Sequence, residues 1–246
     1  MSLKVLKFGG SSVANKTLLF KVANIIINQY LSGNDIVAVV SAQGKTTNEL
    51  VKKSQEINEF ASAREMDVLL STGEQASVAL LCMAVEKLGF KAISLLGWQI
   101  GFGTDSEHQN ARIKRLTTKR IRKELKKNNI VIVAGFQGIN DWEDITTLGR
   151  GGSDTSAVAI SAAMNADACV IYTDVDGVYD MDPNKFPNAK KFSKISYDFM
   201  LDLTASGTKV LNHRAVEMAK KYSVEIKVLS TFTENEGTIV SGRVHK

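Results

Sequence analysis

Short apolar runs of strand length alternate along this chain with longer segments whose apolar residues recur at helical spacing. We expect strands at residues 5–8, 36–40, 92–96, 130–134, 169–172 and 225–229, and helices at residues 17–31, 47–63, 75–88, 153–165 and 209–222. Continuous apolar runs are typical of parallel strands covered on both faces. The alternation therefore predicts an α/β fold with a mostly parallel central sheet and helices on both faces.

The length and composition fit one globular domain. A chain of 246 residues can bury a full core, and 44% hydrophobic with 23% charged residues is ordinary for such a domain. With two prolines and no linker-like stretch, residues 1–246 are expected to form a single domain. No apolar run approaches the roughly 20 residues of a bilayer span, and the start lacks a signal-peptide layout. We therefore expect a cytoplasmic location and no membrane partner.

The residues that usually hold metals are sparse. Cys82 and Cys169 lie far apart, and the three histidines show no ligand-like spacing. The sequence predicts neither a disulfide framework nor a protein-bound metal.

A glycine-rich turn follows the first predicted strand. Its glycines, Gly9 and Gly10, let backbone N–H groups approach an anion, and Ser11 or Ser12 can cap the next helix. Lys7, at the end of the strand, can reach the same anion. The turn is not a Walker A loop, so phosphate binding and a plain strand-to-helix turn with a surface lysine both remain open.

A second glycine-rich turn, at residues 149–153, places Arg150 between glycines before a helix that opens at Ser153 or Asp154. A guanidinium can hold a carboxylate through two parallel hydrogen bonds. The same turn can cap the helix, and one loop can do both.

Three further segments carry charge or glycine. Residues 173–179 follow a strand and could contact a ribose or nucleotide-bound Mg²⁺, or form a simple acidic turn. Residues 98–110 are expected to form a loop or small hairpin near the active face. Residues 112–127 contain nine lysines and arginines without interleaved aromatics, which favours the solvated face of an amphipathic helix over nucleic-acid binding.

Taken together, these motifs resemble the aspartokinase branch of the amino acid kinase family. The matching segments are residues 7–13 (KFGGSSV), 39–42 (VVSA), 44–48 (GKTTN), 71–74 (STGE), 149–157 (GRGGSDTSA), 173–179 (TDVDGVY) and 209–211 (KVL). They occur in the family's order and cover nearly the whole chain. The resemblance implies phosphoryl transfer from ATP, with Mg²⁺, to the side-chain carboxylate of L-aspartate, by a protein that self-associates as a homodimer.

The resemblance also implies a role for each matching position. Lys7 and Asp154 are the expected catalytic pair, with Lys7 on the transferring phosphate and Asp154 orienting it. The expected nucleotide contacts are Lys7, Gly9, Gly10, Ser11, Thr173, Asp174, Tyr179 and Lys209. The expected aspartate contacts are Ser41, Thr47, Glu74, Arg150 and Ser153, with Glu74 on the ammonium and Arg150 on the α-carboxylate.

The residue types suit this reaction, because a carboxylate nucleophile is already ionised at neutral pH and needs no general base. Bringing it to a phosphate is mainly a task of positioning and charge neutralisation. A kinase for another amino acid or carboxylate, and a non-catalytic nucleotide-binding protein, are the alternatives.

Two departures from the family pattern affect the details. Asn184 stands where the family commonly has an arginine that contacts ATP, so we expect weaker nucleotide binding or another lysine in its place. The family also usually continues into regulatory ACT domains. We therefore expect lysine and threonine to leave the activity of these 246 residues unchanged.

Overall fold

The computed structural model describes residues 2–242 apart from 182, 184, 187 and 209. Its strands are β1 (Ser2–Phe8), β2 (Asn34–Val40), β3 (Ala92–Leu95), β4 (Phe102–Thr104), β5 (Ile113–Leu116), β6 (Ile130–Ala134), β7 (Gln137–Ile139), β8 (Ile145–Thr147), β9 (Ala168–Thr173), β10 (Lys194–Ser196), β11 (Ile226–Ser230) and β12 (Thr238–Ser241). Its α-helices are α1 (Lys16–Leu31), α2 (Thr46–Ile57), α3 (Ala63–Lys87), α4 (Lys119–Leu125), α5 (Gly152–Met164), α6 (Tyr197–Ala205) and α7 (His213–Tyr222), with 3-10 turns η1 (Gly10–Val13) and η2 (Trp98–Ile100).

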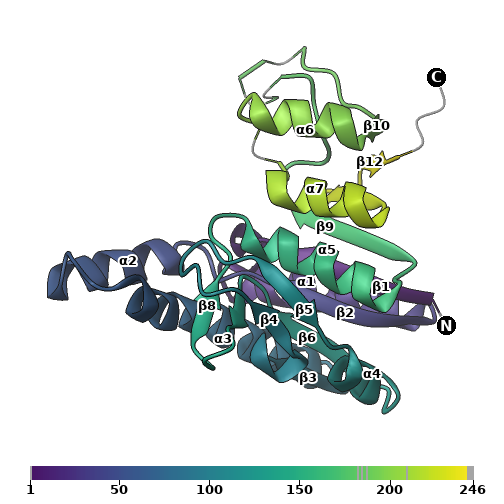
Figure 1. The fold of residues 1–246 in the computed structure, drawn as a ribbon. Helices are drawn as coiled ribbons and strands as arrows, with labels where there is room; N and C mark the ends of the chain where they lie inside the picture. The colour runs from purple at the N-terminus through teal and green to yellow at the C-terminus, as the bar shows by residue number, and fades with distance from the viewer. Residues whose placement is uncertain (1, 182, 184, 187, 209, 243–246) are drawn as a thin grey trace.

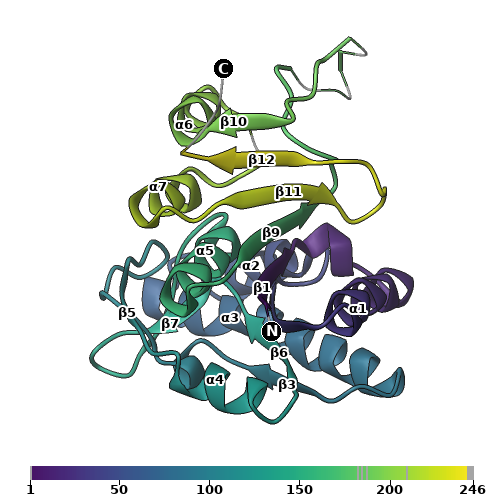
Figure 2. The ribbon, with the colours of Figure 1, turned by 90° about the vertical axis from the view of Figure 1, so that its right-hand side faces the viewer.

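The central sheet has eight strands in the order β10-β12-β11-β9-β1-β2-β6-β3. The six strands from β11 to β3 are parallel, and β12 runs antiparallel to β11. Figure 2 shows this sheet between α5 and α7 on one side and α1 on the other. The predicted α/β fold with a mostly parallel sheet is confirmed.

Alternate side chains of the strands divide the core between the two faces of the sheet. Leu6 and Phe8 of β1 pack in one hydrophobic cluster with residues of α1 and α3. Val5 of the same strand belongs to a second cluster with residues of α4, α5, α6 and α7. Both faces of β1 are therefore buried, which is why the strand reads as a continuous apolar run.

A smaller sheet, in the order β5-β4-β7-β8, lies beside the main one. The expected loop or small hairpin at residues 98–110 is confirmed in part: η2 and β4 lie in it, but β4 pairs with β5 and β7, both outside that segment. The expectation of one amphipathic helix over residues 112–127 is wrong. Residues 113–116 pair with β4 as a strand, and helix α4 covers only residues 119–125.

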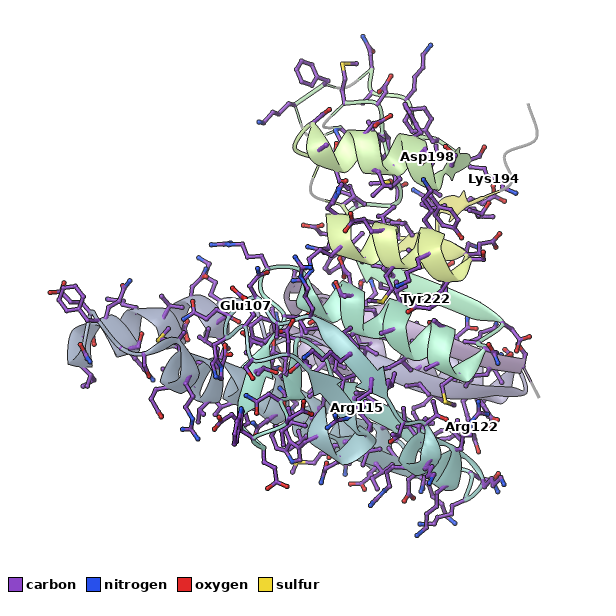
Figure 3. All side chains as sticks on the ribbon, viewed as in Figure 1. Glu107, Arg115, Arg122, Lys194, Asp198 and Tyr222 are labelled. Atoms are coloured by element: carbon purple, nitrogen blue, oxygen red, sulfur yellow. The ribbon has the colours of Figure 1, made fainter. Side chains whose placement is uncertain are left out.

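Several basic residues of that segment form ion pairs within the domain. Arg115 pairs with Asp141 at 2.6 Å, and Arg120 and Lys127 both pair with the buried Glu124. Figure 3 shows Arg115 and Arg122 at the end of the molecule opposite Lys194 and Asp198. These contacts match a solvated face of a globular domain.

Helix α3 begins earlier than the sequence periodicity predicts. The expected helices at 47–63 and 75–88 become α2, which ends at Ile57, and α3, which runs from Ala63 through residues 71–74. Ser62 accepts a hydrogen bond from the amide of Glu65, and a serine followed three residues later by glutamate is a helix-start signal that could have located this end. The early turns contain Asp67 and Ser71, buried polar residues that hide the apolar period.

In length and composition alone, α3 could cross a membrane. In this fold it packs against α1, β3 and β8 and carries buried carboxylates at Asp67 and Glu74. These are features of a core helix. Figure 1 shows α2 and the start of α3 extending together from the sheet.

The last predicted helix, residues 209–222, is shorter in the structure. Helix α7 begins at His213 because Asn212 has extended backbone angles and its side chain accepts from the amide of Ala215. Helix α6, capped by Ser196, precedes it and was not predicted. Lys209 lies outside the described residues.

Candidate active site

Lys7 and Asp154 meet where the central sheet joins helix α5. Lys7 is the penultimate residue of β1, and Asp154 lies in the first turn of α5, a favourable place for a carboxylate. Lys7 Nζ lies 2.7 Å from Asp154 Oδ1, and the side chains are only 12% and 9% exposed. The structure therefore joins the two residues expected to form the catalytic pair.

The first glycine turn packs against the loop that follows β2. The amide of Gly44 donates to the carbonyl of Gly10 at 2.9 Å, and a Cβ built on Gly10 would lie 2.5 Å from the carbonyl oxygen of Ala42. Gly10 thus allows two loops to touch. The expectation that Ser11 or Ser12 caps the next helix is wrong, because the 3-10 turn η1 intervenes and Asn15 caps α1 instead.

Alanine substitution is expected to change stability at Gly10 but not at Gly9. Gly10→Ala is expected to lower the free energy of unfolding by about 1–3 kcal/mol, because the methyl group must displace backbone. Gly9→Ala is expected to leave it nearly unchanged, because its Cβ meets only ordinary contacts and its φ is −71°. Urea unfolding of both variants checks this; equal midpoints would contradict it.

A cavity of about 660 Å³ opens beside the Lys7–Asp154 pair. It is lined by Lys7, Gly10, Ser41, Thr47, Glu74, Arg150, Ser153 and Asp154 among the expected site residues. All five residues assigned to the acceptor by the resemblance thus line one cavity. Among the lining residues that the sequence reasoning missed are Asn48, Gln109, Phe136 and Thr147.

Glu74 is the buried acid of this cavity. Its residue is 4% exposed, and Oε1 accepts from the amide of Ala42 at 3.0 Å. Within the described part of the chain, Oε2 has no hydrogen-bond partner. Burial raises the pKa of Glu74 to about 7, although the amide of Ala42 opposes this rise. A cationic group placed in the cavity would satisfy the free oxygen and favour the ionised form.

Arg150 is exposed on a turn whose two flanking glycines, Gly149 and Gly151, have φ of +74° and +71°. L-residues rarely adopt this region, so the glycines allow the chain to reverse around Arg150. The turn leads directly into α5, where Ser153 and Asp154 in the first helical turn are buried. Arg150 is therefore a cation carried at the mouth of the cavity.

Asp67 supports the floor of the cavity and was not singled out by the sequence reasoning. Its fully buried carboxylate accepts from the amides of Gln109 and Thr147, from the Thr147 hydroxyl at 2.5 Å, and contacts His108 Nδ1 at 2.8 Å. Asp67 thereby joins α3 to the loop at Gln109 and to the end of strand β8, and both Gln109 and Thr147 line the cavity. The hydrogen-bond partners of Asp67 are distant in sequence, so no local motif predicts its supporting role.

A second cavity, of about 450 Å³, opens beyond the end of β9. It is lined by Asp174, Val175, Tyr179, Met181, Pro183, Lys185, Ser206, Gly207, Thr208 and Val210. Asp174 and Tyr179 are expected nucleotide residues. Lys185 supplies a lysine near the expected arginine position, whereas Asn184 lies outside the described residues.

Asp176 holds the turn after β9 in place; it lies in the expected acidic turn of residues 173–179 but was given no role of its own. Burial alone would raise its pKa, but hydrogen bonds from Tyr179, Asn235 and Lys191 lower it to about 2. The bond to Asp176 in turn raises the pKa of Tyr179 to about 12. The Tyr179 ring is therefore fixed at the wall of the second cavity.

Three expected nucleotide residues line neither cavity: Gly9, Ser11 and Thr173. A Cβ built on Gly9 would lie 3.6 Å from Lys7 Nζ and 4.0 Å from the carbonyl of Tyr172, so Gly9 lies between the two strand ends. The Thr173 hydroxyl donates to Asp174 Oδ1 at 3.0 Å. These residues lie at the ends of neighbouring strands β1 and β9.

Among the described residues, no group of three or more histidine, cysteine, aspartate or glutamate side chains could hold a metal ion. Mg²⁺ commonly binds through one or two carboxylates together with substrate phosphates.

Known proteins resemble this chain over nearly its whole length. The chain is 52% identical over 244 residues to an aspartokinase of Geobacillus stearothermophilus, covering 99% of this chain and 60% of that protein. It superposes on the crystal structure of aspartate kinase from Synechocystis with a TM-score of 0.89 and 43% identity, covering 100% of this chain and 40% of that one.

The fold is also that of E. coli aspartokinase III in complex with aspartate and ADP, with a TM-score of 0.90 and 24% identity, covering 99% of this chain and 65% of that one. This chain thus spans about 60% of the length of the curated relatives that it matches. Residues 2–230 match the description "Amino acid kinase family", and the chain belongs to that family.

Proposed function

We propose that this chain is an aspartate kinase catalytic domain, which transfers the γ-phosphate of ATP to the side-chain carboxylate of L-aspartate and forms 4-phospho-L-aspartate. The observation that carries the proposal is the charge set of one cavity. Lys7 and Arg150 supply two cations, and Glu74 supplies a buried acid with a free oxygen. The α-carboxylate and ammonium of an amino acid complement Arg150 and Glu74, and Lys7 can neutralise the phosphoryl group that its side-chain carboxylate receives.

In the proposed reaction, an oxygen of the aspartate side chain attacks the γ-phosphorus. The new P–O bond forms as the bond between the γ-phosphorus and the β,γ-bridging oxygen breaks. ADP leaves with the electron pair of the broken bond. Lys7, held by Asp154, neutralises charge on the transferring phosphoryl group. Arg150 holds the α-carboxylate, Glu74 pairs with the ammonium, and Ser41, Thr47 and Ser153 complete the pocket.

The nucleotide is proposed to lie between the two strand ends. Its base and ribose occupy the cavity beside Asp174 and Tyr179, and its phosphates extend past Thr173 toward Gly9, Gly10 and Ser11. Mg²⁺ bound to the phosphates supplies further charge neutralisation. The E. coli relative was crystallised with aspartate and ADP, which supports this pair of ligands.

We further propose that residues 1–246 form a single domain, that it assembles as a homodimer, and that it works in the cytoplasm, where ATP and aspartate are found. Sedimentation equilibrium tests the assembly, since a homodimer has twice the chain mass of 26.8 kDa.

The reaction is tested by trapping its product with hydroxylamine. The protein is incubated with ATP, Mg²⁺ and L-aspartate, and parallel samples contain glutamate, N-acetylglutamate or no acceptor. Aspartyl hydroxamate in the aspartate sample alone is the expected result, because hydroxylamine captures acyl phosphates.

Hydroxamate with another acceptor would identify a different carboxylate kinase. A folded protein that binds ATP but forms no hydroxamate would contradict the proposal and favour a non-catalytic nucleotide-binding role.

A further inference from the structure

The start of helix α7 donates hydrogen bonds to the turn that carries Arg150. Two backbone carbonyls flank Gly149, those of Leu148 and Arg150. Arg214 Nη1 donates to the carbonyl of Leu148 at 2.9 Å, and Asn212 Nδ2 donates to the carbonyl of Arg150 at 2.8 Å. Both ends of this short reversal are therefore held by one helix start, more than 60 residues away in sequence.

Asn212 also contacts the catalytic pair. Its backbone amide donates to Asp154 Oδ2 at 3.2 Å, while Asp154 Oδ1 faces Lys7. A Cβ built on Gly151 would lie 2.3 Å from Asn212 Nδ2. The glycine turn is thus shaped against this side chain, and one residue touches both Asp154 and the Arg150 backbone.

The same asparagine has an ordinary structural task, which must be separated from any role in the site. Asn212 caps α7 through its Oδ1, which accepts from the amide of Ala215 at 3.3 Å. The donor to Arg150 is the other atom of the amide, Nδ2. A substitution that keeps the cap and removes the donor can therefore distinguish the two.

We propose that Asn212 is a positioning residue that sets the Arg150 turn for the acceptor's α-carboxylate. This inference rests on the proposed function of the cavity. A guanidinium on a turn with two left-handed glycines has many available orientations, and binding a carboxylate requires one of them. Fixing the carbonyl of Arg150 reduces the entropy lost when the acceptor binds, so Asn212 acts on acceptor affinity through Arg150.

Asn212→Ser is the discriminating variant, because serine caps helices about as well as asparagine but carries no amide donor. We expect the KM for aspartate to rise roughly 3- to 10-fold, the effect of one hydrogen bond. The KM for ATP and the Tm are expected to stay near their original values. The matched control is Ser196→Ala, which removes the cap of α6. It should lower the Tm by roughly 2–4 °C without changing the KM for aspartate.

A double-mutant cycle with Arg150→Ala tests whether Asn212 acts through Arg150. If it does, Asn212→Ser causes no further rise in KM once Arg150 is alanine. An unchanged KM in Asn212→Ser alone, or the same fold rise in both backgrounds, would overturn the inference.

The cycle is repeated on the Kd for aspartate by isothermal titration calorimetry, which needs no turnover. A chain that binds aspartate without phosphorylating it would contradict the proposed function alone, and the cycle would still test Asn212. A chain that does not bind aspartate would overturn both.

Discussion

Lys7→Ala is expected to lower turnover by roughly 10²-fold or more, because one well-placed donor to a developing charge contributes about 2.7–4 kcal/mol to the barrier. Lys7 Nζ is the cation paired with Asp154 beside the acceptor cavity, and the pair is largely buried. Turnover is measured as hydroxamate formation at saturating ATP and aspartate.

The matched control is Lys4→Ala, on the same strand. Lys4 Nζ donates to Gln29 Oε1 at 2.8 Å and takes no part in the cavity. Its turnover should stay near the original value. Circular dichroism checks that Lys7→Ala remains folded. We expect it to fold, because Asp154 keeps the hydrogen bond that it accepts from the amide of Asn212. Near-normal turnover in folded Lys7→Ala would remove this lysine from the mechanism.

Glu74→Gln is expected to stabilise the fold and impair acceptor binding together. Burial raises the pKa of Glu74 to about 7, from 4.5 for an ordinary glutamate. Between those values the unfolded chain releases a proton that the folded chain keeps, so the glutamate lowers stability as the pH rises through this window. Above pH 7 this loss of unfolding free energy is complete and amounts to roughly 3 kcal/mol. Glutamine does not ionise, so the Glu74→Gln variant does not lose this stability as the pH rises.

The free energy of unfolding of Glu74→Gln should therefore exceed that of the original protein at pH 8 and match it near pH 4. Urea unfolding at both pH values measures this. A variant less stable at pH 8 than the original would contradict the raised pKa of the buried Glu74 carboxyl.

The same carboxylate gives the acceptor KM a pH dependence. The KM for aspartate should fall as the pH rises through about 7, because ionised Glu74 pairs with the ammonium. In Glu74→Gln it should be roughly 10- to 100-fold higher, the effect of a charged hydrogen bond, and should lose that pH dependence. A wild-type profile with no change near pH 7 would show that Glu74 does not meet the ammonium.

The structure brings together expected site residues that stand in contiguous sequence motifs. Lys7 with its two glycines, and Arg150 with Asp154, each stand at a junction between a strand and a helix, so chain connectivity alone puts them at the edge of the sheet. The roles assigned to these residues came from family resemblance and stay predictions until the variants are measured.

The second sheet, and the residues that support the cavity, could not be predicted from contiguous motifs. Strands β4, β7 and β8 have three residues each, too few for an alternating pattern to be recognised. Asp67 and Asn212 look like ordinary polar residues, and their partners lie tens of residues away. Glu74 was named from a motif, but its burial and raised pKa arise from helix α3 entering the core.

By itself, the sequence determined the six parallel strands of the central sheet, the main helices between them and the two glycine turns, because these depend on apolar runs and local backbone preferences. Only the tertiary structure decided that the turns share a cavity with Glu74, and that α7 holds the Arg150 turn in place. Such features depend on contacts between segments far apart in the chain, and a local pattern carries no record of them.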